Sequence, residues 1–294
     1  MDKERTEQKW DGKSRGGSFG YLFFVYLIRF LGVGAAYLFL SLVVIYFIPF
    51  APKATAAIWS YNRRRLHYGR CRSVMELYLH YYRFGQVLID KIALGAGMQN
   101  RYRFVFDRYE RFLEIINGDS GVVLIGAHVG NWEAGSAFFG EYARKINIVM
   151  FDGEHQNIKK VLEKQSAGNG FKIIAVNKDS IEAMLQIKVA LNSGEYVCFN
   201  GDRYVHPENL KKVDFLGGEA SLPRGPFLIA SRCRVPVVFY YAMREKNRTY
   251  RFIFREAESV RDTDALIAQY ITSLESVVRR YPRQWFNFYK YWEN

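Results

Sequence analysis

The longest apolar stretch of the chain lies near its N-terminus. Residues 30–50 (FLGVGAAYLFLSLVVIYFIPF) contain no charged side chain, and the apolar residues 19–28 precede them with only Arg29 between. As a helix, residues 30–50 would measure about 31 Å, close to the hydrocarbon thickness of a bilayer. The stretch is too long for a signal peptide and lacks a small-x-small cleavage site. The pattern therefore predicts a membrane helix that stays on the mature protein.

A buried helix of a globular core is the alternative interpretation of this stretch. Prolines and aromatic residues near its ends favour the membrane, because they are typical of interfacial anchoring: Tyr37, Tyr46, Phe47, Pro49 and Pro52. The orientation stays open, since positive charges are equally frequent on the two sides. They are Lys3, Arg5, Lys9, Lys13 and Arg15 before the stretch, and Lys53, Arg63, Arg64, Arg65 and Arg70 after it. A true span, a helix that stays in one leaflet, and a helix broken around Arg29, Gly32 and Gly34 all fit.

The rest of the chain has the pattern of an α/β domain. Apolar residues recur at helical spacing from Ser73 to Ala93, which predicts an amphipathic helix. Beyond it, strands are predicted at 103–106, 122–127, 146–151, 172–176, 196–200, 235–243 and 249–254. Helices are predicted between them at 108–117, 132–143, 157–164, 180–191, 225–231 and 262–280. Strands that are apolar almost throughout and alternate with helices predict a mostly parallel sheet covered by helices on both faces.

The chain divides by composition into three parts. Residues 1–18 form a basic leader, residues 19–70 a membrane-embedded or membrane-associated helical section, and residues 71–294 one domain without an internal repeat. The aromatic end of the chain, residues 284–292 (QWFNFYKYW), is predicted to pack as core or to lie at a lipid interface.

Charge and cysteine content narrow the function. The chain of 294 residues has 42 Lys and Arg against 29 Asp and Glu, a net charge of +13, which implies an anionic partner. Its three cysteines, Cys71, Cys198 and Cys233, form no C-x-x-C pair, so a disulfide scaffold and a cysteine zinc finger are excluded. Phosphate-loop and dinucleotide-binding motifs are absent, and the basic residues form no recognisable nucleic-acid-binding module.

The most informative segment is VVLIGAHVGNWEAGSAFF, residues 122–139. His128 follows a buried strand, and Asn131 is a suitable N-cap for a helix that carries Glu133. The carboxyl end of a strand is the usual active-site position in such folds. A carboxylate that is hydrogen-bonded to one imidazole nitrogen raises the basicity of the other nitrogen, which can then deprotonate a hydroxyl group. Two interpretations stay open: a catalytic His128 and Glu133 pair, or a salt-bridged histidine beside a capping asparagine.

Two arginines form a second group of candidates. Asp202 and Arg203 come just past the predicted strand 196–200, and Arg224 precedes the predicted helix 225–231. Guanidinium groups suit the binding of phosphate or the stabilisation of a developing oxyanion. A structural Asp and Arg pair on a loop is the alternative.

The order of several blocks resembles a known family. The chain contains GAHVGNWE (126–133), NGDR (200–203), FLGGEASLPRG (215–225), RVPVVF (234–239) and RQWFNFYKYW (283–292). This set resembles the bacterial lipid A biosynthesis (late) acyltransferases, within the lysophospholipid and glycerol-phosphate acyltransferase superfamily. The resemblance implies transfer of a fatty acyl chain from the thioester of acyl carrier protein to a hydroxyl of a lipid, without cofactor, metal or covalent acyl-enzyme.

The resemblance also implies roles for individual residues. His128 matches the family's base and Glu133 its orienting partner, whereas Asn131, Gly201, Asp202, Arg203, Arg224 and Gly225 are implied in substrate binding. Pro223, Arg224 and Gly225 stand where glycerol-phosphate acyltransferases carry Pro-Glu-Gly, which points away from glycerol phosphate as acceptor. The basic chain suits two anionic partners, acyl carrier protein and a phosphorylated lipid A precursor.

We therefore expect a membrane-bound O-acyltransferase on the cytoplasmic face of a bacterial inner membrane. A second hypothesis keeps the chemistry with another membrane acceptor, such as an aminoacyl lipid, a glycolipid or an aryl lipid. A third is a catalytically idle membrane adaptor that binds acyl carrier protein; the His128 and Glu133 pair argues against it.

Overall fold

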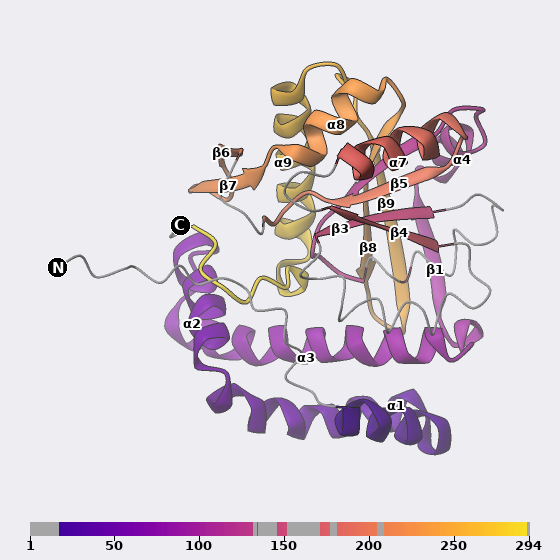
Figure 1. The fold of residues 1–294 in the computed structure, drawn as a ribbon. Helices are drawn as coiled ribbons and strands as arrows, with labels where there is room; N and C mark the ends of the chain where they lie inside the picture. The colour runs from indigo at the N-terminus through magenta and orange to yellow at the C-terminus, as the bar shows by residue number, and fades with distance from the viewer. Residues whose placement is uncertain are drawn as a thin grey trace.

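A central sheet of seven strands forms the core of the computed structural model (Figure 1). The structure describes residues 18–131, 134, 146–151, 171–176, 181–204 and 209–292. In spatial order the strands are β1 (Arg103–Asp107), β9 (Thr249–Glu256), β8 (Val237–Arg244), β2 (Val122–Gly126), β5 (Tyr196–Asn200), β3 (Ile146–Phe151) and β4 (Phe171–Val176). Neighbours are parallel except β8 and β9, which pair antiparallel across a tight turn. The predicted, mostly parallel sheet is thus confirmed.

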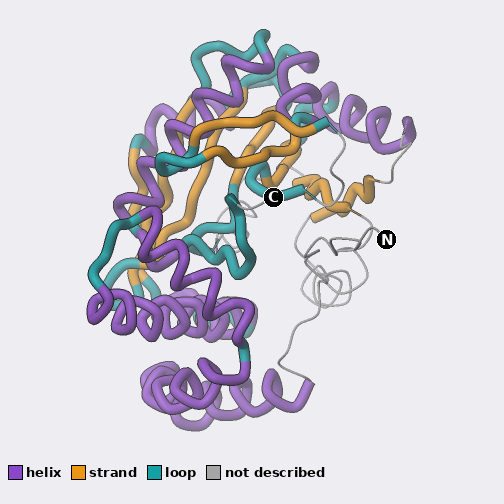
Figure 2. Tube along the Cα trace, turned by 90° about the vertical axis from the view of Figure 1, so that its left-hand side faces the viewer, coloured by secondary structure: helices purple, strands orange, loops and turns teal. Residues whose placement is uncertain are grey.

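Helices cover both faces of this sheet. Alternate residues of each central strand point to opposite sides, so Val123 and Ile125 of β2 belong to one apolar cluster, and Val122 and Leu124 to the other. The first cluster includes residues of α7 (Ile181–Asn192), α8 (Gly225–Cys233) and α9 (Thr263–Arg280). The second includes residues of α3 (Arg70–Gly95) and α4 (Tyr109–Ile116). Figure 2 shows the sheet between these two sets of helices.

The predicted elements differ from the observed ones in a few places. A separate antiparallel hairpin of β6 (Leu210–Asp214) and β7 (Glu219–Pro223) was not predicted, because its short strands carry many polar residues. Strand β8 starts two residues later than predicted, after Pro236, which has no backbone N–H to donate. The helices predicted at 132–143 and 157–164 lie outside the described residues, apart from Ala134.

The apolar N-terminal segment forms α1 (Ser18–Phe50), which is two helices joined at Gly32. Gly32 has φ 83° and ψ 169°, a conformation that side-chain-bearing residues rarely adopt. The rings of Phe23 and Phe39 lie 5.0 Å apart, although 16 residues of straight helix would separate them by about 24 Å. The segment is therefore a helical hairpin, which agrees with the broken helix among the three predicted arrangements.

One face of this hairpin packs on the protein and the other is exposed. Val33, Ala36, Leu40 and Val44 are buried in the cluster that contains α3, and α1 lies beside α3 below the sheet (Figure 1). The outer face exposes large apolar side chains by 64% to 75%: Phe30, Leu31, Leu38 and Leu42. Within the described part of the chain, residues 23–50 are the one helical segment that meets a length and composition criterion for crossing a membrane, counted across the break at Gly32. An apolar face of this size suits contact with lipid.

Two short helices and the aromatic C-terminus complete the fold. After α1 come α2 (Pro52–Ser60) and one turn of π-helix, η1 (Tyr61–Arg65), which lead into α3. A short 3₁₀ helix, η4 (Pro282–Gln284), precedes the last segment, which runs back beside α2 in Figure 1. Trp285, Phe286 and Tyr291 of this segment are buried, so the aromatic end packs as core, one of its two predicted locations.

Candidate active site

His128 lies just beyond the carboxyl end of the buried strand β2. The chain turns sharply at Gly130, where φ is 61° and a Cβ atom would lie 2.1 Å from the carbonyl oxygen of Ala242 on β8. The backbone N–H of Gly130 donates to Gln284 at 2.9 Å, and that of Asn131 donates to Ala242 at 2.8 Å. Strand β8 and the segment at Gln284 therefore fix the loop that presents His128, and only glycine fits at position 130.

Asp202 occupies the equivalent position beyond the neighbouring parallel strand. Gly126 of β2 pairs with Asn200 of β5, so His128 and Asp202 each follow a paired residue by two positions. The ring Nδ1 of His128 lies 2.8 Å from Oδ1 of Asp202, and the backbone N–H of His128 donates to Oδ2 at 3.0 Å. The structure thus brings together two residues that the sequence placed in separate blocks.

The surroundings keep Asp202 ionised. Its side chain is 1% exposed, and burial alone would raise the pKa of the carboxyl group. The charge and hydrogen bonds of His128, together with Arg203, outweigh burial and hold this pKa below its ordinary value. The carboxylate therefore accepts a hydrogen bond from Nδ1–H. In the neutral imidazole, this arrangement leaves the lone pair on Nε2. The His128 side chain is 21% exposed, so this site is reachable from solvent.

The C-terminal segment braces both residues of the pair from behind. The backbone N–H of Phe286 donates to the carbonyl of His128 at 3.0 Å, and Trp285 forms a bridge with Val129. The Tyr291 hydroxyl donates to the carbonyl of Asp202 at 2.8 Å, and both groups are buried. Sequence reasoning missed Tyr291 as a supporting residue, because a distance of 89 positions along the chain separates it from Asp202.

Gly201 is held between the sheet and the helices that cover it. A Cβ atom at Gly201 would lie 2.9 Å from side-chain atoms of Ile125 and Phe227 and 3.1 Å from Tyr270. Its backbone N–H donates to Gly126 at 3.0 Å. The absence of a side chain at Gly201 lets the loop carrying Asp202 lie close to β2.

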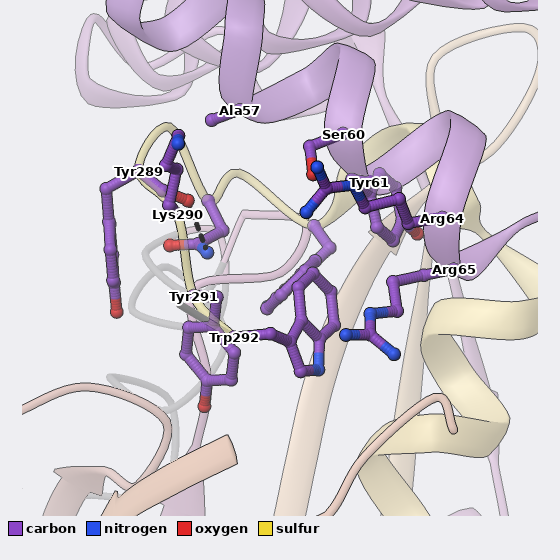
Figure 3. A pocket seen from close by; sticks show the side chains of 11 residues that line it. Ala57, Ser60, Tyr61, Arg64, Arg65, Tyr289, Lys290, Tyr291 and Trp292 are labelled. Atoms are coloured by element: carbon purple, nitrogen blue, oxygen red, sulfur yellow. Dashed lines mark hydrogen bonds between the residues drawn. The ribbon is translucent and has the colours of Figure 1, made fainter. Parts of the chain in front are cut away.

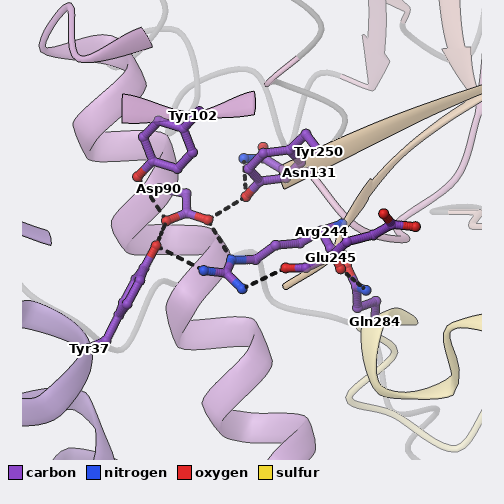
Figure 4. Close-up of polar contacts among 8 residues, drawn as sticks. All are labelled: Tyr37, Asp90, Tyr102, Asn131, Arg244, Glu245, Tyr250 and Gln284. Atoms are coloured by element: carbon purple, nitrogen blue, oxygen red, sulfur yellow. Dashed lines mark hydrogen bonds and ion pairs between the residues drawn. The ribbon is translucent and has the colours of Figure 1, made fainter. Parts of the chain in front are cut away.

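Asn131 connects the loop to a buried polar cluster (Figure 4). Its Oδ1 accepts the backbone N–H of Ala134 at 3.2 Å, a contact of the kind that an N-cap residue makes. Its Nδ2 donates to the Tyr250 hydroxyl at 3.3 Å, and the side chain is 3% exposed. Both ends of the amide are therefore used within the protein. Glu133, the predicted partner of His128, lies outside the described residues.

Asp90 on α3 is the centre of that cluster. It accepts hydrogen bonds from Tyr250 and Arg244 at 2.7 Å each, from Tyr102 at 2.9 Å, and from Tyr37 of α1. Asp90 and Arg244 are 0% and 4% exposed, and the pair keeps the pKa of the guanidinium raised even though burial acts to lower it. The cluster links α1, α3 and the two central antiparallel strands to the active-site loop. In the sequence, Asp90 occupies a core-facing position of the predicted helix 73–93, and this signal could have revealed the cluster.

The two predicted arginines lie in different environments. Arg203 follows Asp202 directly, and its Nη2 donates to the carbonyl of Phe286 at 2.5 Å. Arg224 is the residue before α8, and its guanidinium lies 3.4 Å from the exposed Asp264 near the start of α9. Gly225 begins α8, and a Cβ atom there would meet open space. The contacts thus place Arg203 beside the His128 and Asp202 pair, and Arg224 with Asp264.

Metal binding has no candidate site in the described part of the chain. No three or more His, Cys, Asp or Glu side chains there gather in an arrangement that could hold an ion. Among the described residues, the groups at this site that can take part in chemistry include the imidazole of His128, the carboxylate of Asp202 and the guanidinium of Arg203.

Comparison with known proteins places this site in a family. No curated protein matches the chain. The family profile described as bacterial lipid A biosynthesis acyltransferase matches residues 84–294, which include the loop of His128, the strand end of Asp202 and the whole C-terminal segment. The match covers well over half of the chain, so this protein belongs to the bacterial lipid A biosynthesis acyltransferase family.

Proposed function

We propose that the protein transfers a fatty acyl chain from acyl carrier protein to a hydroxyl group of a lipid A precursor. The observation that carries this proposal is the hydrogen bond between His128 Nδ1 and the buried Asp202 Oδ1, at 2.8 Å, in a chain of this family. It is the arrangement that a general base needs, because the carboxylate fixes the tautomer and stabilises the imidazolium that forms.

The proposed reaction proceeds in one transfer without an acyl-enzyme. Nε2 of His128 takes the proton of the acceptor hydroxyl while the hydroxyl oxygen attacks the carbonyl carbon of the thioester. The resulting oxyanion collapses, the C–S bond breaks, and the carrier thiolate takes the proton from the imidazolium. Arg203 is proposed to stabilise the oxyanion, since it follows Asp202 directly and its positive charge helps to lower the pKa of that carboxyl group. Arg224 and Gly225 remain proposed acceptor-binding residues, and the reaction needs no cofactor.

Glu133 stays in the proposal as a second candidate carboxylate for orienting His128. Its position five residues after the histidine matches the family pattern. Because Asp202 already holds Nδ1, variants of the two acids separate their roles. Loss of activity in Asp202→Asn alone would assign the orientation of the ring to Asp202. Loss in both Asp202→Asn and Glu133→Gln would make both carboxylates necessary.

The proposed location is the cytoplasmic face of a bacterial inner membrane. The exposed apolar face of α1 supports membrane attachment, and the net charge of +13 supports attraction of an acidic carrier and an anionic lipid surface. Attachment raises the local concentration of an enzyme at the surface where its acceptor resides. Acyl carrier protein is therefore proposed as the soluble partner and the anionic lipid as the membrane partner.

The proposal is tested by acyl transfer with purified full-length protein. Wild type, His128→Ala and Glu133→Ala would receive acyl carrier protein with a long-chain thioester and a lipid A precursor in detergent, with products read by mass spectrometry. We expect one added acyl chain with wild type and none with His128→Ala. Near-normal transfer by both variants contradicts the assignment of the base. Wild-type transfer to another membrane lipid, but not to the precursor, would favour the same chemistry on a different acceptor.

A further inference from the structure

A polar hollow lies next to the C-terminal segment that supports the active-site loop (Figure 3). Its lining residues come from α2 and η1 on one side and from the C-terminal segment on the other, and it is partly open to solvent. The residues that matter for the argument are Ser60, Arg64, Arg65, Trp285, Asn287 and Lys290. None of the sequence motifs pointed to this hollow.

The described residues that line the hollow include several cationic side chains. Arg64, Arg65 and Lys290 contribute three cations and Ser60 a hydroxyl group, and the described residues that line the hollow include no carboxylate. Arg65 is held in place, because its Nη1 donates to the carbonyl of Gly217 at 2.7 Å and its guanidinium lies 4.8 Å from the ring centre of Trp292. An arrangement of guanidinium, ammonium and hydroxyl groups suits the oxygens of a phosphate group.

Two residues that line the hollow each have a buried polar atom, and the donor on Trp285 indicates a ligand with acceptor oxygens. The indole Nε1 of Trp285 and the Oδ1 of Asn287 are buried, and neither has a hydrogen-bond partner among the described residues. Their residues are 2% and 6% exposed. The indole nitrogen is a donor only, and buried donors in native proteins almost always have an acceptor. A ligand oxygen in the hollow would supply the acceptor that Trp285 lacks.

The hollow shares a wall with the His128 and Asp202 pair. Trp285 bridges Val129, the residue after His128, and Tyr291 donates its hydroxyl to the carbonyl of Asp202 at 2.8 Å. On its other side, α2 follows directly after the apolar hairpin α1. A group bound here is therefore anchored between the membrane-facing section and the base.

We propose that this hollow binds a phosphate group of the lipid acceptor and so positions the acceptor hydroxyl near His128. The proposal rests on the proposed function. The acceptor is favoured over the phosphodiester of the acyl carrier because the hollow begins where the apolar hairpin ends, so a lipid headgroup reaches it from the bilayer surface.

The test compares binding of one lipid with and without its phosphates. The probe is a phosphorylated lipid A precursor and its enzymatically dephosphorylated form, each titrated into full-length protein in detergent without acyl donor. For Arg64→Gln with Lys290→Gln, we expect the dissociation constant of the phosphorylated lipid to rise about tenfold or more, whereas the dephosphorylated lipid binds as it does to wild type. Trp285→Phe removes one N–H and keeps an aromatic ring, and we expect a rise of about threefold to tenfold.

The control removes the same two charges elsewhere. The control variant combines Lys188→Gln on α7 with Arg232→Gln on α8, two helices at the far end of the molecule from α2 in Figure 1. It should bind the phosphorylated lipid as wild type does. In the transfer assay, the Arg64 and Lys290 double variant should show a higher KM for the acceptor and an unchanged KM for the acyl carrier. The His128→Ala protein should bind the phosphorylated lipid normally.

Three outcomes would overturn the proposal. They are unchanged affinity of the Arg64 and Lys290 double variant, equal affinity of wild type for the two forms of the lipid, and a rise in KM for the acyl carrier alone. Phosphate-dependent binding by a wild-type protein that transfers no acyl chain would support the hollow and contradict the proposed function. Normal acyl transfer together with unchanged lipid binding in the variants would support the proposed function and contradict the role of the hollow.

Discussion

Asp202 holds His128 at two points, with one carboxylate oxygen on the backbone N–H and the other on the ring Nδ1. The first contact fixes the loop and the second fixes the ring. Because both oxygens are used, the rotation of the carboxylate and the orientation of the imidazole depend on each other. Tyr291 fixes the backbone of Asp202 in turn.

Replacing Asp202 by asparagine should reduce kcat by about a hundredfold to ten-thousandfold. The change keeps the side-chain volume but removes the charge that stabilises the imidazolium. Steady-state acyl transfer measures it, and circular dichroism checks the fold. Asp119→Asn is the control, since Asp119 is exposed and lies before β2, at the opposite end of that strand from His128. A kcat within twofold of wild type for Asp202→Asn would remove this residue from the catalytic arrangement.

Replacing Asp90 by asparagine should lower the free energy of unfolding by about 3 to 5 kcal/mol, because the change leaves the buried charge of Arg244 uncompensated. The midpoint of urea denaturation in detergent measures the effect. Replacing both residues by apolar ones of similar size should recover part of the loss. Lys212→Gln, which breaks an exposed ion pair with Glu219, should leave the midpoint unchanged. A similar midpoint for Asp90→Asn and wild type would contradict the importance of the buried pair.

Alanine at Gly201 should destabilise the protein by about 1 to 3 kcal/mol, since the added methyl group overlaps Ile125, Phe227 and Tyr270. Gly225→Ala is a matched control, because a Cβ atom at that position meets open space. Thermal unfolding of the two variants in the same detergent provides the measurement. Equal stability of the two would show that the loop relaxes around the methyl group.

Acidification should destabilise the fold through His80. Burial lowers the pKa of His80 from 6.5 to about 4, so the unfolded chain binds a proton that the folded protein does not bind between these values. Its contribution to stability is complete above pH 6.5 and falls by about 3 kcal/mol as the pH drops to 4. We expect His80→Gln to show a weaker loss of stability between pH 7 and pH 4 in urea unfolding. His67→Gln is the control, because His67 is exposed. An unchanged pH dependence in His80→Gln would contradict the buried neutral state.

The hairpin of α1 should keep both of its ends on one side of the bilayer. The two halves, 18–31 and 33–50, measure about 21 and 27 Å, each shorter than a hydrocarbon core of about 30 Å. Two single-cysteine proteins can be compared in sealed vesicles with an impermeant maleimide. One carries Ser18→Cys with the three native cysteines replaced by serine, and the other keeps only the exposed Cys71. Accessibility from the same side is expected. Accessibility from opposite sides would show a span.

The sequence identified the secondary structure of the catalytic domain well, for a physical reason. Strands β2, β5 and β8 are buried on both faces, so their residues are apolar almost throughout and differ clearly from the neighbouring helices. The hairpin of β6 and β7 was missed because its partly exposed residues Lys211 and Lys212 break that pattern. The hydrophobic segment was identified by length, but its fold-back depends on one backbone conformation at Gly32.

By itself, the sequence determined the type of fold, the position of His128 after a buried strand and the apolar character of the N-terminus. These properties depend on residues close together in the chain. The tertiary structure decided which strands are neighbours, and this pairing brings Asp202 rather than another carboxylate to Nδ1. It also decided that Tyr291 supports Asp202, and that Arg64, Arg65 and Lys290 line one hollow. These contacts join residues far apart in the chain, so local patterns contain no record of them.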